Sequence, residues 1–337
     1  MTRPLLYALW GIALALFLLL VTYHGWSDVA AAMAQAGFGL IIVVLFHIAP
    51  MTIDTLAWLV LQPVPARRPF FQLMLFRWYG EAVNALLPVA QVGGDILRGR
   101  LHARTGIPGP TALGIVVVDL ATTVYAQMAF AAFGLVGFAI FLRGHDDLVW
   151  HLGATLLVLG ILVLGFFVAQ QRGGFTRVVR TFEAMLMVDA PHPRSYAQAL
   201  DRTIHRLYRR HRPLVMSISL HLLAWLVGAG EIYLAAAFCD TPVTLIQAVV
   251  LESLVVIVRA AAFLIPGALG VQEGGFILLG SYFGVPPDQA LAISLIRRVR
   301  ELALGVPGLL VWQLNEVTRG TASHQSKLKH VFPRHVK

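Results

Sequence analysis

The sequence predicts an all-α integral membrane protein with about six to eight transmembrane helices and two broken, re-entrant helical hairpins. Hydrophobic residues make up 58% of the 337 residues and charged residues only 13%, whereas soluble proteins average about 25% charged residues. The mean hydropathy is +0.75. Two of the apolar regions also carry Pro, Gly and ionisable residues, and hydrocarbon tolerates broken backbone only where it packs against protein or lines a wet cavity.

The charge and cysteine content narrow the possible partners. The net charge is +9, but the basic residues fall between apolar runs, where the positive-inside rule explains them. No nucleic-acid-binding motif is present. The single cysteine, Cys239, allows neither an internal disulfide nor a cysteine metal site. We therefore expect a membrane lipid as the partner, with no nucleic acid, no metal and no cofactor.

Hydropathy and basic residues set the expected order of spans. The run 5–21 is about 17 residues long, which exceeds the usual 7 to 15 of a signal peptide and predicts an uncleaved first helix. No Lys or Arg occurs between residues 4 and 66, which places the first loop outside, and Arg67 and Arg68 mark the return to the cytoplasm. Ordinary spans are predicted at 38–60, 110–141, 152–169, 213–238 and 290–314. Both termini are expected in the cytoplasm of a bacterial inner membrane.

The segment 170–212 is the strongest topological marker, with nine arginines against three acids. Its residues Tyr196, Leu200, Ile204 and Leu207 form one apolar stripe at helical spacing, which predicts a helix lying on the inner leaflet. The segment is either a solvated cytoplasmic connector or a site for anionic inner-leaflet lipids. We expect residues 1–315 to form one polytopic membrane domain and residues 316–337 to form a basic cytoplasmic tail.

The two broken regions share a spacing. In the first, residues 70–100, Pro88 is followed seven residues later by Asp95; in the second, residues 243–284, Pro266 is followed seven residues later by Glu273. A charged residue also lies seven positions before each proline. Because both termini are expected in the cytoplasm, the chain must cross the membrane an even number of times. This count makes the first hairpin open toward the cytoplasm and the second toward the outside. This pattern indicates an inverted-topology repeat whose halves meet near the midplane around a substrate site, although chance similarity of two Pro/Gly breaks is the alternative.

Ionisable residues at membrane depth cost about 2.5 to 3.5 kcal/mol each, so they must pair or meet water. The candidate site for a lipid head group comprises Glu81, Asn84, Asp95, Arg98, Arg259, Glu273, Arg297 and Arg298. The candidate hinge residues are Pro88, Gly93, Gly94, Pro266, Gly267 and Gly270. An arginine of the last span is the best candidate for a phosphate contact, because guanidinium binds phosphate with two hydrogen bonds. Arg297 with Glu301, and Asp95 with Arg98, could instead be purely structural pairs.

Two motifs carry a family resemblance: NALLP with GGDILR, from Asn84 to Arg98, and IPGALGVQE, from Ile265 to Glu273, followed by an arginine at 297 or 298. With these motifs, residues 5–315 resemble the membrane region of lysylphosphatidylglycerol synthases, the flippase-like part of MprF-type proteins. The runs LLPVAQVGGD and VQEGG are most similar to the branch associated with hopanoid biosynthesis. The resemblance implies a protein that moves or presents a polar or anionic lipid.

The chain departs from the family pattern in two ways. It stops at Lys337, which leaves no room for the soluble synthase domain, so we expect no aminoacyl transfer. Relatives often have an arginine shortly before the acid of the third span, and this chain has none before Asp119, which puts the role of that residue in doubt.

Two other functions compete with lipid transport. A non-transporting scaffold for lipid biosynthesis would use the basic segment 170–212. An intramembrane enzyme would use Asp95 with Asp119 or Asp54 as paired carboxylates, but Val92 stands where the G-x-G-D motif of aspartyl proteases needs its first glycine. No zinc-protease, serine-hydrolase or DDxxD motif occurs either. We therefore expect a protein that is not an enzyme.

Overall fold

The computed structural model describes residues 36–87, 92–141, 146–174, 193–262 and 268–331, with isolated positions 34, 176, 177 and 265. All secondary structure in these ranges is helical, as predicted. The predicted helix at 5–21 and the predicted hinge residues Pro88, Pro266 and Gly267 lie outside the described residues.

Four long apolar helices in the described part of the chain can cross a membrane. Two are continuous and two have a local break in the middle, which divides each into two labelled helices. Their elements are α3 (Gly39–Phe46) with α4 (Ile48–Leu61), α7 (Gly109–Phe141), α8 (Asp146–Gln171), and α11 (His211–Gly228) with α12 (Gly230–Phe238). They confirm the predicted spans at 38–60, 110–141, 152–169 and 213–238.

The two broken regions form helical hairpins of matching dimensions. The first consists of α5 (Phe70–Leu86) and α6 (Gly93–Ala103), and the second of α13 (Leu245–Ala261) and α14 (Val271–Ser281). In both hairpins the first helix has 17 residues and the second has 11. A helix of that second length rises only about 16 Å, roughly half of the hydrocarbon core. The hairpins are therefore re-entrant elements rather than pairs of full spans.

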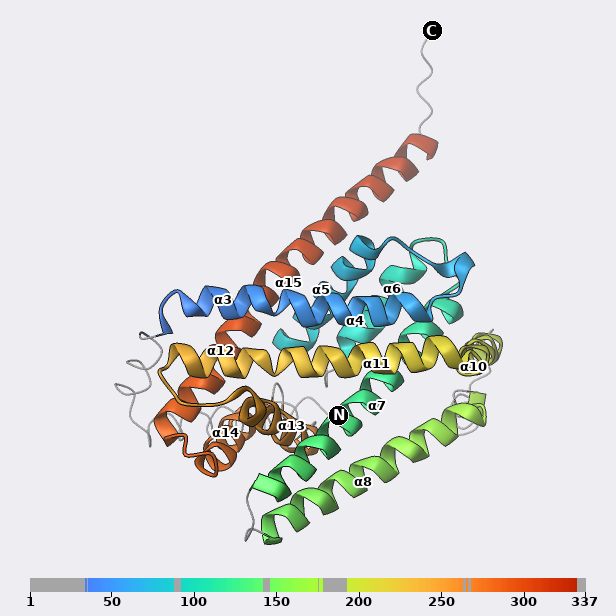
Figure 1. Ribbon diagram of the computed structural model, residues 1–337. Helices are drawn as coiled ribbons and strands as arrows, with labels where there is room; N and C mark the ends of the chain where they lie inside the picture. The colour runs from blue at the N-terminus through green and yellow to red at the C-terminus, as the bar shows by residue number, and fades with distance from the viewer. Residues whose placement is uncertain are drawn as a thin grey trace.

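The hairpins enter the bundle from opposite ends. The span of α3 and α4 lies beside the span of α11 and α12 and runs in the opposite direction (Figure 1). At one end Arg210 Nη1 donates to the main-chain oxygen of Leu61 at 2.9 Å, and at the other end Gly39 faces the ring of Phe238. Because α5 follows α4 from the first end and α13 follows α12 from the second, the two hairpins are inverted relative to each other.

A constant spacing relates the two halves of the chain. The first residues of α6 and α14, Gly93 and Val271, are 178 positions apart, and so are the first residues of α7 and α15, Gly109 and Pro287. The same interval separates the acids Asp95 and Glu273. This shared register covers two pairs of helix starts and a pair of acids, so it argues against chance similarity and for an internal repeat.

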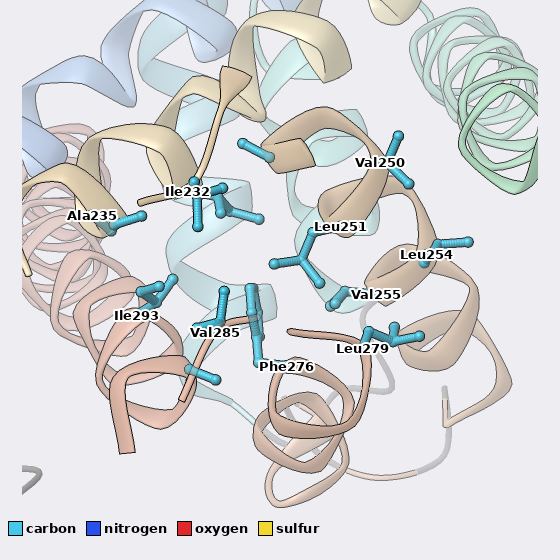
Figure 2. Close-up of a cluster of buried hydrophobic side chains, with 14 of the residues drawn as sticks. Ile232, Ala235, Val250, Leu251, Leu254, Val255, Phe276, Leu279, Val285 and Ile293 are labelled. Carbon is cyan, nitrogen blue, oxygen red and sulfur yellow. The ribbon is translucent and has the colours of Figure 1, made fainter. Parts of the chain in front are cut away.

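The halves interlock through their hairpins. Helix α5 packs on α15 (Pro287–Val331), and α13 packs on α7, so each hairpin contacts the long helix of the other half. Figure 2 shows the core of the second half, where Leu251 and Leu254 of α13 meet Phe276 and Leu279 of α14. A second apolar cluster is centred on α5, α6 and α7. Each hairpin is thus packed into one of these two cores.

The expectation for the apolar stripe in the basic segment 170–212 needs correction. The apolar stripe predicted at 196–207 exists in α10 (Pro193–Tyr208), but Leu200, Ile204 and Leu207 are buried against α7 and α8 and are not free to lie in the inner leaflet. Protein surface takes the place of lipid because α7 presents small residues such as Gly114 to this helix. Helix α15 runs through the predicted domain boundary at 315 and ends at Val331.

Gly93 and Gly94, two of the candidate hinge residues, form the first turn of α6. A Cβ atom at Gly94 would lie 2.0 Å from the main-chain oxygen of Gly80, so Gly94 is the point where α5 and α6 touch. Gly94→Ala should therefore lower stability by about 3 kcal/mol, measured as thermal unfolding in detergent. The control is Gly274→Ala, which meets no described atom within 4 Å. Equal melting temperatures for the two variants would contradict this contact.

Candidate functional site

A cavity of about 370 Å³ lies where the ends of α5 and α13 meet α4, α11, α12 and α15. Its size falls in the range of small-ligand pockets. Its wall is densely charged for a position within a membrane domain. The ionisable residues that line it are His47, Asp54, Glu81, Glu231, Glu252, Arg259, Arg297, Arg298, Arg300 and Glu301.

Five of the predicted site residues line this cavity, namely Glu81, Asn84, Arg259, Arg297 and Arg298. They come from three helices that are far apart in the sequence, and the packing of α5 on α15 and of α13 on α7 brings them together. The other three predicted residues, Asp95, Arg98 and Glu273, do not line it. They lie in the ion pairs described below.

The charged residues seven positions before Pro88 and Pro266 occupy related places in the two hairpins. Glu81 lies near the end of α5 and Arg259 near the end of α13, and both reach the cavity. The inverted repeat therefore puts an acid and a base at related positions in the wall of one cavity. In the described part of the chain, no carboxylate oxygen lies within 4 Å of Arg259, which makes this guanidinium available to an anionic group.

Glu273 supports the break in the second hairpin. Gly270, at a φ of +76°, precedes α14, and its N–H donates to Glu273 Oε2 at 2.7 Å. The other oxygen of this fully buried carboxylate accepts from Arg298 Nε at 2.9 Å. A positive φ favours glycine, so Gly270 suits this position at the start of α14. Glu273 acts on the cavity indirectly, by orienting Arg298.

The arginines of α15 form a row of ion pairs. Arg297 pairs with Glu252 of α13, and Arg300 Nε lies 3.3 Å from Glu231 of α12. Arg298 Nη1 donates to Glu301 at 3.0 Å, so the expected pairing of Arg297 with Glu301 is wrong. The helix turns Arg297 toward α13 instead. These contacts tie α12, α13 and α14 to one face of α15.

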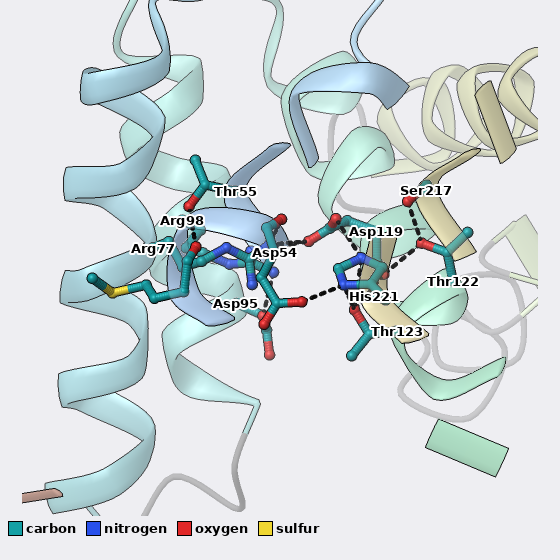
Figure 3. Close-up of polar contacts among 11 residues, drawn as sticks. Asp54, Thr55, Arg77, Asp95, Arg98, Asp119, Thr122, Thr123, Ser217 and His221 are labelled. Carbon is teal, nitrogen blue, oxygen red and sulfur yellow. Dashed lines mark hydrogen bonds and ion pairs between the residues drawn. The ribbon is translucent and has the colours of Figure 1, made fainter. Parts of the chain in front are cut away.

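A second group of charges lies behind the cavity and is called here the Asp119 cluster (Figure 3). It consists of Asp54, Arg77, Asp95, Arg98, Asp119 and His221. Asp119 is fully buried and accepts from Arg77 Nη2 at 3.1 Å and from Arg98 Nη1 at 3.0 Å. Arg98 also donates to Asp95 at 2.7 Å, which confirms that expected pair. The cations for Asp119 thus come from α5 and α6, not from the residues that precede it in α7.

Six ionisable residues of the cavity wall are absent from the sequence-based site, namely His47, Asp54, Glu231, Glu252, Arg300 and Glu301. His47 Nδ1 lies 2.6 Å from Glu231 and its Nε2 lies 3.4 Å from Glu81, so this ring bridges the first hairpin and α12. A signal was present, because His47 and Asp54 interrupt a span that is otherwise free of charged residues. Ionisable residues inside a transmembrane helix are functional candidates by default.

The fold and the cavity define a multi-pass α-helical membrane protein with a charged internal site between two inverted hairpins. The family model for the lysylphosphatidylglycerol synthase TM region matches residues 8–308, and the chain belongs to this family. It is also similar to a UPF0104 membrane protein of Methanothermobacter thermautotrophicus, with 24% identity over 251 residues that cover 69% of this chain and 71% of that protein.

Proposed function

We propose that this protein moves a polar or anionic lipid between the two leaflets of the membrane. The observation that carries the proposal is the charged cavity at the meeting point of two inverted, half-spanning hairpins. Transporters built from inverted repeats bind their substrates at such points, where broken helices expose polar groups near the midplane. The cavity would hold the head group while the acyl tails stay in the surrounding lipid.

Arg259 is the preferred contact for the phosphate of the head group. The neighbouring arginines of α15 are already paired with Glu231, Glu252, Glu273 or Glu301. For Arg259, no such partner occurs among the described residues. Guanidinium presents its donors in a planar fork that matches phosphate geometry. An incoming phosphate would therefore complete the hydrogen bonding of Arg259 without breaking an existing ion pair.

A hopanoid or hopanoid precursor is one polar lipid that would suit the resemblance to the hopanoid-associated branch. Placement in a bacterial inner membrane with cytoplasmic termini is likewise proposed from the distribution of basic residues. The basic residues of α10 would then face the anionic inner leaflet.

Reconstitution tests the proposal. Purified protein in vesicles of phosphatidylethanolamine and phosphatidylglycerol should accelerate the leaflet transfer of tail-labelled phosphatidylglycerol, read as the fraction of label that an impermeant quencher reaches. Arg259→Gln should slow transfer about 10- to 100-fold, because a hydrogen bond to a charged group contributes about 1.5 to 3 kcal/mol. The matched control is Arg202→Gln, which changes an exposed arginine on α10. This variant should transfer lipid at the normal rate.

Three results would overturn the proposal. Folded protein that accelerates transfer of no phospholipid or hopanoid would contradict transport. Loss of function on neutralising the α10 arginines, with Arg259 variants active, would favour a scaffold. A change in the mass of the lipid after incubation would favour an enzyme.

A further inference from the structure

A buried histidine in the Asp119 cluster faces groups that accept hydrogen bonds. His221 Nδ1 lies 2.6 Å from Asp54 Oδ1, and its Nε2 lies 3.2 Å from Asp119 Oδ1 and 3.1 Å from Thr123 Oγ1 (Figure 3). Thr123 Oγ1 donates its own proton to the main-chain oxygen of Asp119 at 2.9 Å, so it accepts from the ring. Both ring nitrogens of His221 therefore require a proton.

A neutral imidazole supplies only one N–H donor. Two ionised carboxylates that face both nitrogens thus require one additional proton, shared by His221 and Asp54. The net charge of the Asp119 cluster also indicates one additional proton. Its two arginines and three aspartates sum to one negative charge, and the additional proton makes the cluster neutral. Neutrality is favoured here because an uncompensated charge is costly in a buried site.

The charged groups around His221 come from several elements. Asp54 approaches from α4 and Asp119 from α7, with Arg77 of α5 and Arg98 of α6 behind them. On α12, Glu231 is bound to His47 and Arg300 and does not reach the ring. Helix α10 adjoins the far end of α11, where that helix begins at His211.

One member of this proton site, Asp54, reaches the cavity. The His221 and Asp119 side chains are fully buried, whereas the Asp54 side chain is 26% exposed and lines the cavity. A proton can therefore pass from cavity water to the Asp54 carboxylate and on to His221. The proton site and the head-group site share this cavity, so both are exposed to the same solution on whichever side of the membrane the cavity opens.

We propose that Asp54, His221 and Asp119 form the proton-binding site of a proton-coupled lipid transporter, in which one proton crosses with each anionic head group. This inference rests on the proposed function and names its energy source. A singly charged phosphate and one proton move without net charge. The transfer then avoids the electrical work of about 2.3 kcal/mol per charge per 100 mV.

The test uses the full chain in the same vesicles, with tail-labelled phosphatidylglycerol as the probe. A pH difference is imposed across the membrane, and the potential is clamped with potassium and valinomycin. The readout is the leaflet ratio of the probe at steady state. With one proton per lipid, the probe should be enriched about tenfold, for each pH unit, in the leaflet that faces the alkaline side.

Variants locate the proton site. His221→Gln can still hydrogen-bond to Asp54 and Asp119 but cannot bind a proton. The steady-state leaflet ratio of the probe should therefore be near one under the pH gradient, whatever the rate of lipid transfer by this variant. Asp54→Asn, which interrupts the route from the cavity, should give the same ratio. His205→Gln, which changes an exposed histidine of α10, should keep the tenfold enrichment.

The outcomes separate the two proposals. Wild-type protein that transfers the probe but leaves it equally divided under the gradient would overturn proton coupling and leave lipid transfer standing. An absence of transfer with and without the gradient would overturn both. Gradient-driven enrichment that persists in both His221→Gln and Asp54→Asn would place the proton elsewhere and overturn this site.

Discussion

Asp119→Asn should destabilise the protein by about 3 to 5 kcal/mol, the usual cost of removing one partner from a buried ion pair. Asp119 is fully buried and is the carboxylate that Arg77 and Arg98 share. Asparagine keeps the size of the side chain but removes the charge. Arg77 would then have no carboxylate within ion-pair distance among the described residues. The expected result is a large fall in the melting temperature of the protein in detergent, followed by tryptophan fluorescence.

Asp95→Asn is the matched control for this substitution. Asp95 binds the same Arg98, but its side chain is 15% exposed and Arg98 keeps its contact with Asp119 in the variant. We expect a loss of about 1 kcal/mol, close to the value of a partly exposed pair. If the two variants melt at the same temperature, Asp119 is not the carboxylate on which the cluster depends.

Gly228→Trp should reduce lipid transfer to the rate of protein-free vesicles while the protein remains folded. Gly228, the last residue of α11, lines the cavity, and a Cβ atom there would meet no described atom within 4 Å. An indole has space to enter a cavity of about 370 Å³, and it would then exclude a head group without changing any charge. The measurement is the leaflet-transfer assay, with melting temperature recorded in parallel.

Gly228→Ala is the control for steric blockage. A methyl group leaves most of the cavity open, and alanine favours a helix over glycine by about 1 kcal/mol, so transfer should persist and stability should not fall. Normal transfer by Gly228→Trp would show that lipid does not pass through this cavity. Loss of transfer by Gly228→Ala as well would point to a need for flexibility at the junction of α11 and α12.

Local features of the sequence determined the helical architecture. Hydropathy over a span is a property of consecutive residues, and it placed the spans at 38–60, 110–141, 152–169 and 213–238 within a few residues of the observed helices. The equal spacing from Pro88 to Asp95 and from Pro266 to Glu273 identified the two hairpins as a repeat. Basic residues between the spans supplied the inverted orientation, which the positions of α5 and α13 confirm.

The composition of the site was decided by tertiary structure. Sequence marks which charges lie at membrane depth, but the rotation of each helix decides which of them face the cavity. Asp95 and Glu273 sit at equivalent positions in the repeat, and both are held in ion pairs outside the cavity wall. His47 and Asp54 gain their roles only because α4 packs beside α11 and α5.

The stripe on α10 shows the same division. Its periodicity predicted a helix with one apolar face, since periodicity depends on local sequence alone. Whether lipid or protein covers that face depends on which helices lie nearby, and here α7 and α8 bury Leu200, Ile204 and Leu207. The sequence by itself thus determined the helices, their breaks and their repeat. The partners of each side chain were settled only when helices far apart in the chain were packed together.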